Sequence, residues 1–501
     1  MKNDPAIKLT AASFGFSAGI FFAGYAIMQL PMVQVLQYVG ARRVLGSLLV
    51  IWGLIASATG AISSVWALCV LRFLLGVAEA GYYPGSILYL SRWLPQEILG
   101  TGNAIFQLSA GSLGTVFGTL SAGVLLSTMD GILGLRSWRW LFVCQGLPAA
   151  FVGVLVLLFM SNTPHEARWL SNEERDHLLA RLAADGATRK RSSSTDGDGI
   201  DGNNEVVVGS ASVDTSVNQT TTPQPIAPSS SSSPATPPPL PLLSAASRSL
   251  RRGTTYIFTL NHFSACILAY NTVFFLPLMT SELLPSLDAA EIACVLAVPF
   301  ALNLITGVIV GQWTDSSDSA RGTRRRRVYA VVFACLSGPL LSLICGLVLL
   351  RAGTATSLSD KSRHVYSIFA LLLLCLAGLT NTSAGGAFWA LHHELQPLEL
   401  RGASISLVNS LGNLGGFVGP YILGALKSTL GPPCPQSGDN NTTVVEGKEH
   451  DCVSSWAWGM IVVAALQMVI ALGVAYGFCG KMQRRGANLT VVEVPTPTRG
   501  V

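Results

Sequence analysis

The sequence predicts an all-α membrane protein that crosses the bilayer many times. Half of its 501 residues are hydrophobic and only 12% are charged, whereas soluble proteins carry roughly 25% charged residues. The apolar residues are gathered into blocks: residues 11–36 and 365–391, for example, contain no Asp, Glu, Lys or Arg. The net charge of +5 is modest for a nucleic-acid-binding protein. A polytopic membrane protein therefore fits this composition better than a set of soluble domains.

Each block is long enough for a transmembrane helix, because about 20 apolar residues cross a hydrocarbon core of about 30 Å. One such block could be a buried helix of a soluble protein, but no soluble core buries so many in series. The eleven predicted spans are residues 11–36, 44–64, 66–90, 98–127, 140–160, 254–280, 292–313, 328–350, 365–391, 402–426 and 455–479.

The basic residues of the short loops predict the orientation, because cytoplasmic loops are richer in Lys and Arg. One alternate set of loops, with the start of the C-terminal tail, holds twelve Lys or Arg residues, and the other set holds seven. The first set includes Arg42, Arg43 and the run Arg324–Arg327. We therefore expect a cytoplasmic C-terminus and an outward-facing loop at 427–454.

This outward loop has features of an extracellular segment. Asn440 and Asn441 are each followed two residues later by Thr, which gives two overlapping N-glycosylation acceptors. Cys434 and Cys452 lie in the same loop, and we hypothesise a disulfide between them.

A low-complexity segment divides the membrane part in two. Residues 183–247 lack aromatic residues and periodicity, and such a composition cannot bury enough apolar surface to fold. Before it, Ser171 and Glu174 have the spacing of a capping box, which predicts a short cytoplasmic helix. The expected organisation is an N-terminal bundle of five spans at 1–161, a cytoplasmic helix and disordered linker at 162–252, a C-terminal bundle of six spans at 253–482 and a cytoplasmic tail at 483–501.

The two bundles resemble each other at an offset of six spans, as expected for a transporter made of two related halves. The string GSLGTVFG at 111–118 matches GNLGGFVG at 412–419, and both should let helix backbones approach closely. By the same count the span 254–280 has no N-terminal counterpart. We expect that a start codon further upstream would supply a first helix, and a natural protein of eleven spans is the alternative.

Arg72 and Glu79 are charged residues inside a predicted span. A charge at the bilayer centre costs about 2.5–3.5 kcal/mol on insertion scales, so it is usually functional. Their spacing of seven residues places both on one helix face. We interpret Glu79 as a group that takes up and releases a proton while its surroundings alternate between wet and dry. The alternative is an internal salt bridge that only stabilises the bundle.

Other polar side chains in the spans are candidates for substrate binding: Tyr25, Gln107, Tyr270, Asn409 and Asn413. Each could equally be a hydrogen bond between helices, worth about 0.6 kcal/mol on average.

Nothing in the sequence favours a metal, a cofactor or an enzyme. The string His392-His393-Glu394 begins like a zinc motif but continues to Pro397, and no phosphate-binding GxxxxGK[ST] string occurs to support direct ATP-driven pumping.

Six strings carry a family resemblance: GIFFAGYAIMQLP at 19–31, VGARR at 39–43, LRFLLGVAEAGYYPG at 71–85, SWRWLFVCQGLPA at 137–149, TPHEARWLSNEER at 163–175 and SLVNSLGNLGGFVGPYILG at 406–424. Together they resemble the anion:cation symporter family of the major facilitator superfamily, which includes allantoate, nicotinate and galactonate permeases. The resemblance implies proton-coupled symport of a small organic carboxylate by alternating access between two six-helix bundles.

The resemblance also implies residue roles. Glu79 falls at the proton-coupling carboxylate and Arg72 at the motif arginine of the same helix, while Tyr25, Gln107 and Asn409 fall on helices that line the central cavity. Arg42, Arg43 and Asp315 belong to the two copies of the gating motif, although the first copy lacks the acidic residue that Asp315 supplies in the second.

One departure from the family keeps a second hypothesis open. The family's first helix ends in an Asp-Arg-x-Asn string whose Arg pairs with the anionic substrate, and no such string precedes residue 11. The chain could therefore be a non-transporting membrane sensor or scaffold with a transporter fold. Translation of the DNA upstream of Met1 distinguishes the two hypotheses.

For the transporter we expect a monomer in the plasma membrane whose partners are a small organic anion, a proton and the lipid bilayer, with no nucleic acid. The sequence does not choose among carboxylates.

Overall fold

The computed structural model describes Ile7 and residues 11–194, 241–284, 289–317, 319–354, 359–430 and 446–487. Within these residues the chain is helical and contains no strand. The helices of the N-terminal half are α1 (Ala11–Val39), α2 (Ala41–Thr59), α3 (Val65–Glu79), α4 (Tyr82–Trp93), α5 (Leu99–Leu108), α6 (Gly114–Thr128), α7 (Ser137–Phe159) and α8 (Asn172–Ser194). Those of the C-terminal half are α9 (Leu242–Leu250), α10 (Gly253–Leu283), α11 (Ala289–Asp315), α12 (Ala320–Thr354), α13 (Asp360–Ser383), α14 (Gly385–Leu395), α15 (Arg401–Asn413), α16 (Gly415–Leu430) and α17 (Glu446–Ala487).

The predicted spans correspond to these helices. Ten helical stretches of the described chain are long and apolar enough to cross a membrane. Predicted span 402–426 is also helical, as α15 and α16, but its Ser and Asn residues make it more polar than the other ten. Four spans are each divided between two helices. A short break separates α3 from α4, α13 from α14 and α15 from α16, and a π-helical segment, Ser109–Leu113, joins α5 to α6.

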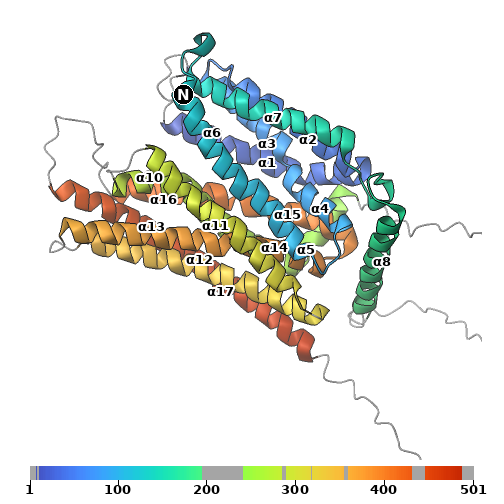
Figure 1. Ribbon diagram of the computed structural model, residues 1–501. Helices are drawn as coiled ribbons and strands as arrows, with labels where there is room; N and C mark the ends of the chain where they lie inside the picture. Colours follow the sequence, from blue (N-terminus) through green and yellow to red (C-terminus); the bar gives the residue numbers. More distant parts are fainter. Residues whose placement is uncertain are drawn as a thin grey trace, which may run out of the picture.

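The helices form two bundles that lie against each other (Figure 1). In the first bundle α1 packs on α3 and α2 packs on α7, and in the second α12 packs on α13 and α17. Contacts between the bundles come from α5, which packs on α11 and α14, and from α1, which packs on α15. Smaller contacts join α6 to α11 and α4 to α15, so the interface between the bundles is made mainly by α1, α4, α5 and α6 on one side and α11, α14 and α15 on the other.

Glycines let the helices of the first bundle approach at backbone distance. A Cβ atom on Gly53 of α2 would lie 2.4 Å from the backbone nitrogen of Ala150 of α7, and one on Gly76 of α3 would lie 2.1 Å from the carbonyl oxygen of Phe21 of α1. No larger residue fits at these points without moving a helix. This close packing is how small residues stabilise helix pairs in lipid.

The matching glycine strings behave differently in the two halves. In the second half, a Cβ on Gly415 would lie 2.2 Å from the carbonyl oxygen of Phe263, so the expected close approach of α16 to α10 is observed. In the first half, nothing lies within 4 Å of the Cβ positions of Gly111, Gly114 and Gly118. The prediction of close backbone contact at 111–118 was therefore wrong, because neighbouring helices reach this segment only through side chains such as Asn303 and Gln145.

Bundle contact is concentrated toward the turn between α11 and α12. A Cβ on Gly311 would lie 2.9 Å from Cα of Thr101, and a Cβ on Gly307 would lie 2.3 Å from the Leu108 side chain. One turn before Gly307 in α11, Asn303 Nδ2 donates a hydrogen bond of 3.0 Å to the Ser112 hydroxyl. Beyond Ser112 the glycines of α6 have no close neighbour. On the side of α5 and α11 the close contacts between the bundles are thus concentrated at the α11–α12 end, whereas α1 contacts the second bundle from Gln37, against Gly402, to Gly19, against Phe417.

The segment between the bundles is partly helical. The capping box at the start of α8 is confirmed, because the Ser171 N–H and hydroxyl both donate to Glu174, at 2.9 Å each. These hydrogen bonds also hold the pKa of the exposed Glu174 carboxyl below its usual value. α8 continues to Ser194 and α9 begins at Leu242, so the two ends of the predicted linker at 183–247 are helical. Residues 195–240 lie outside the described part of the chain.

The contact between α2 and α7 can be tested by replacing Gly146 with Ala. The added methyl would lie 2.7 Å from the carbonyl oxygen of Gly53, and overpacking of this kind costs roughly 1–3 kcal/mol. We expect a lower thermal unfolding midpoint for the purified variant. Gly118→Ala is the matched control, because nothing lies within 4 Å of its Cβ position, and its midpoint should be unchanged or slightly higher. Equal midpoints for the two variants would contradict the close contact.

Candidate functional site

The candidate site begins at the end of α3, where α1 lies against it. A Cβ on Gly24 of α1 would lie 2.5 Å from the carbonyl oxygen of Phe73, so the two helices touch at their backbones. Glu79 is the last residue of α3 and Arg72 lies two turns earlier on the same helix. This packing places Tyr25 of α1 within electrostatic reach of Glu79.

The Glu79 carboxylate is not neutralised by direct contact. No hydrogen bond or ion pair joins it to any residue in the described ranges, and Arg72 acts on it only at longer range. Tyr25 from the first bundle and Tyr270 from the second both lie close enough to interact with it electrostatically. Glu79 is therefore a partly buried, unpaired acid at the interface between the bundles.

Asn409 links the two bundles beside this acid. Its Nδ2 donates a hydrogen bond of 3.0 Å to the hydroxyl of Tyr25, and its Oδ1 lies 3.1 Å from Nε2 of His262. Since the amide oxygen can only accept, His262 must carry its proton on Nε2 in this arrangement. Asn413 Nδ2 donates to the backbone oxygen of Asn409 at 2.8 Å, and Cys266 lies 3.7 Å from the His262 ring nitrogen.

The other two predicted binding residues also lie at the bundle interface. The rings of Tyr270 and Phe22 of α1 pack edge to face with centroids 5.6 Å apart. Gln107 of α5 lies against Gly385 of α14, where a Cβ would be 2.1 Å from its Oε1. This amide oxygen is buried and has no hydrogen-bond partner among the described residues. Four of the five predicted binding residues thus contact the opposite bundle, whereas the contacts of Asn413 are with Asn409 and Cys266 of its own bundle.

Two residues of this region were missed as site residues. His262 is noticeable in the sequence only as a lone histidine in an apolar span, and its link to Asn409 depends on α10 and α15 packing together. Trp389 of α14 donates a hydrogen bond of 2.9 Å to the hydroxyl of Tyr83 of α4, which is a second polar link between the bundles. Neither pairing has a signal in the sequence, because the partners are more than a hundred residues apart.

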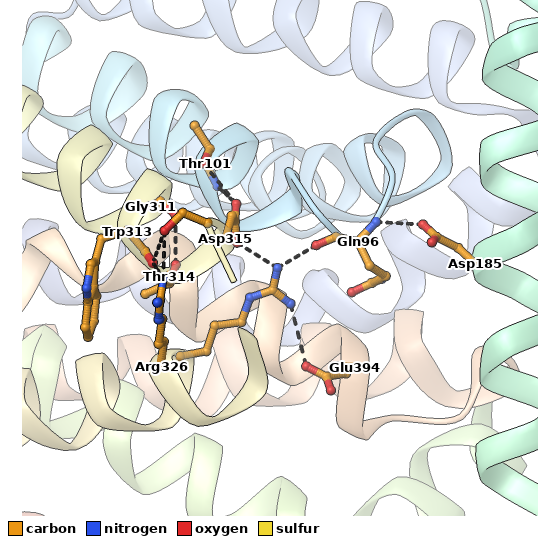
Figure 2. Close-up of polar contacts among 11 residues, drawn as sticks. Gln96, Thr101, Asp185, Gly311, Trp313, Thr314, Asp315, Arg326 and Glu394 are labelled. Carbon is orange, nitrogen blue, oxygen red and sulfur yellow. Dashed lines mark hydrogen bonds and ion pairs between the residues drawn. The ribbon is translucent and has the colours of Figure 1, made fainter. Parts of the chain in front are cut away.

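Asp315 links the two bundles near the turn between α11 and α12 (Figure 2). Its Oδ2 accepts hydrogen bonds from the backbone N–H of Thr101, at 2.7 Å, and from the Thr101 hydroxyl, at 2.9 Å. Its Oδ1 accepts from Arg327 of α12 at 2.8 Å. The carboxylate thus caps the first turn of α5, where a negative charge is favoured by the helix dipole.

Arg327 joins further groups to this network. It donates to the backbone oxygen of Gln96 at 2.6 Å and lies 3.6 Å from Glu394 of α14, which also pairs with Arg324. The Arg327 and Asp315 side chains are only 1% and 5% exposed. We call this set of residues the closure network: Gln96, Thr101, Asp315, Arg324, Arg327 and Glu394.

The remaining predicted gating residues do not reach Asp315. Arg42 donates to the backbone oxygens of Leu157 and Leu158 at 2.6 and 3.2 Å, so it ties α2 to the end of α7 within one bundle. Arg43 is exposed. The turn between α1 and α2 therefore differs from its counterpart between α11 and α12, which matches the missing acidic residue in its sequence.

Other predicted residues are located as follows. Cys434, Asn440 and Asn441 lie outside the described residues, and the side chain of Cys452 is not described, so the disulfide and glycosylation stay predictions. His392 is buried and its Nε2 lies 2.9 Å from the Ser404 hydroxyl. Among the described residues no group of three or more His, Cys, Asp or Glu is placed to hold a metal ion.

The closure network can be tested by replacing Asp315 with Asn. The substitution removes the nearer of the two acidic partners of buried Arg327 and leaves only Glu394, at 3.6 Å; removing one partner of a buried ion pair costs about 3–5 kcal/mol. We expect a clearly lower thermal unfolding midpoint, partly restored in the double variant Asp315→Asn/Arg327→Gln. The control is Glu97→Gln, whose partner Arg181 and own side chain are 45% and 67% exposed, because exposed pairs contribute about 0–1 kcal/mol. Similar midpoints for both single variants would refute the role of the network.

Comparison with known proteins supports this architecture. A solved structure of the proton:xylose symporter XylE, bound to 6-bromo-6-deoxy-D-glucose, superposes with a TM-score of 0.57 at 15% sequence identity, covering 93% of this chain and 88% of the other. At this identity the likeness concerns the fold alone.

Two relatives are similar in sequence. A protein of Agrobacterium vitis that is named for tartrate transport is 29% identical over 425 residues, which cover 85% of this chain and 78% of the relative. A protein of Pseudomonas putida, NicT, named for metabolite transport, is 36% identical over 194 residues, which cover 39% of this chain and 44% of the relative.

These names agree with the resemblance to anion:cation symporters. The family model described as Major Facilitator Superfamily matches residues 5–420, most of the chain and both bundles. The chain therefore belongs to the Major Facilitator Superfamily of membrane transporters.

Proposed function

We propose that this protein is a secondary active transporter that moves a small organic anion together with a proton. The observation that carries the proposal is the unpaired Glu79 carboxylate at the interface between the bundles, beside Tyr25 and Tyr270. An unpaired charge within the membrane is costly and is most often part of an ion or substrate pathway. A carboxylate that meets water on one side and then the other can bind and release one proton per cycle.

The polar groups around Glu79 suit an anionic substrate. The hydroxyls of Tyr25 and Tyr270 come from the two bundles, so one small molecule could contact both at once. Arg72 supplies a positive charge on the same helix as Glu79. The relative named for tartrate transport favours a carboxylate as the substrate.

We infer that the α11–α12 end faces the cytoplasm, since the basic loops gather there. The C-terminus is then cytoplasmic, and in the present arrangement the closure network holds the bundles together at this end. Opening inward requires the closure network to break. We propose a monomer, because a single chain supplies both sides of the interface, and the plasma membrane stays the predicted location.

Glu79→Gln tests the coupling role in proteoliposomes. Glutamine cannot release a proton, so we expect proton-driven accumulation of labelled tartrate, or of the acid found by a screen of organic acids, to fall to the level of empty liposomes. Exchange of labelled for unlabelled substrate at equal pH should persist. Glu97→Gln, an exposed acid, should leave accumulation unchanged.

Two outcomes would contradict the proposal. Undiminished accumulation by Glu79→Gln would exclude Glu79 as the coupling group. Recovery of full accumulation in Arg72→Gln/Glu79→Gln would show that the two charges only balance each other. If the unmodified protein transports no acid of the screen, the hypothesis of a non-transporting sensor gains support.

A further inference from the structure

The four arginines at 324–327, near the start of α12, have two kinds of partner: two pair with acids and two lie over aromatic rings. Arg324 and Arg327 pair with Glu394 and Asp315 in the closure network. Arg325 and Arg326 have no acidic partner within the described part of the chain. In Figure 2, Arg326 reaches toward Trp313 rather than toward Glu394. The positive charges of Arg325 and Arg326 are therefore not neutralised by an acid of the described chain, and they lie beside the closure network.

These two arginines lie over aromatic rings. Arg325 Nε donates to the hydroxyl of Tyr329 at 2.8 Å, and its guanidinium lies 5.3 Å from the centre of that ring. Arg326 donates to the Ser316 hydroxyl at 2.7 Å and to the backbone oxygen of Trp313 at 3.1 Å, with its guanidinium 5.9 Å from the Trp313 ring. Trp and Tyr are enriched where spans meet the head-group region of a bilayer. The arrangement thus has the composition of a membrane interface.

An apolar pocket of about 310 Å³ adjoins the same two rings. Its walls come from α11, α12 and α13 and include Val310, Trp313, Tyr329, Phe333, Thr380 and Ser383. The hydroxyls of Thr380 and Ser383 already donate to backbone oxygens of their own helix, each at 3.1 Å, so they offer little to a polar ligand. Its size is at the small end of the roughly 300–1,000 Å³ of ligand pockets.

The pocket opens on the outer surface of the bundle. Trp313, Tyr329 and Phe333 on its rim are 47%, 48% and 66% exposed, and α11, α12 and α13 all contain spans that cross the membrane. Its surroundings are therefore lipid chains rather than water. Basic residues beside a pocket between transmembrane helices are suited to an anionic lipid head group, and Arg325 and Arg326 lie over the two rings that border this apolar pocket.

We propose that this pocket binds an anionic phospholipid, with the phosphate held by Arg325 and Arg326 and part of one acyl chain in the pocket below Trp313 and Tyr329. The charge complementarity favours an anionic over a zwitterionic lipid. The apolar walls favour a lipid over a free phosphate, since a free phosphate would leave them empty. The lipid would contact the turn that carries Asp315, next to the closure network.

Native mass spectrometry of the full-length protein in detergent tests this proposal. The protein is titrated with phosphatidylglycerol or phosphatidylcholine, and the bound lipid is counted. We expect phosphatidylglycerol to bind more tightly, and Arg325→Gln/Arg326→Gln to lose about tenfold of that affinity. The control Arg251→Gln/Arg252→Gln removes the same charge from exposed residues at the start of α10 and should bind as the unmodified protein does.

The pocket is tested separately. Thr380→Phe fills it without changing the charge and should weaken phosphatidylglycerol binding, and an unchanged thermal unfolding midpoint shows that this variant is folded. Excess glycerol phosphate should not displace the lipid.

Four results would each overturn the proposal. Two concern the charge: equal losses of affinity in both double-arginine variants, or no preference for phosphatidylglycerol. Two concern the pocket: undiminished binding by folded Thr380→Phe, or full displacement of the lipid by glycerol phosphate.

Discussion

The contact of Asp315 with Arg327 and with the first turn of α5 is the interaction on which the arrangement of the two bundles depends. Both side chains are almost fully buried, and a buried charge is tolerated only when its partners replace the water it has lost. Asp315 obtains three donors, two from Thr101 and one from Arg327. Gly100 is required beside it, because a Cβ there would lie 2.5 Å from Asp315 Oδ1.

Two other acids of the membrane part show what pairing means for function. Glu282 accepts from Lys427 at 2.6 Å and from the indole of Trp456 at 2.6 Å, and all three residues belong to one bundle. This acid is fully partnered and stabilises its bundle. Glu79 has no such partners among the described residues. Its charge therefore destabilises the bundle without forming a stabilising ion pair, which favours a role in transport.

Much of the fold could be predicted from the sequence, because a span must be apolar over its whole length. All eleven predicted blocks are helical, and most bounds agree within five residues; α12 begins eight residues before its predicted span, and α17 extends nine residues before and eight beyond its own. The site was predicted in part. Glu79 and Tyr25 are conspicuous as polar residues in apolar spans, whereas the pairing of Asn409 with His262 is not. The prediction for the glycine string at 111–118 was wrong, since a small-residue pattern does not reveal how closely a partner helix approaches.

By itself the sequence determined which segments cross the membrane, where the two halves divide and which polar residues are placed within the spans, because these follow from local composition. Only the tertiary structure decided which polar residues meet. Asp315 is one acid near a basic run in the sequence, but it joins the bundles because α11 packs on α5 and brings Thr101 to it. Arg42, in the matching turn, binds the end of α7 instead. Such pairings depend on helix packing over long sequence separations, and no local pattern encodes them.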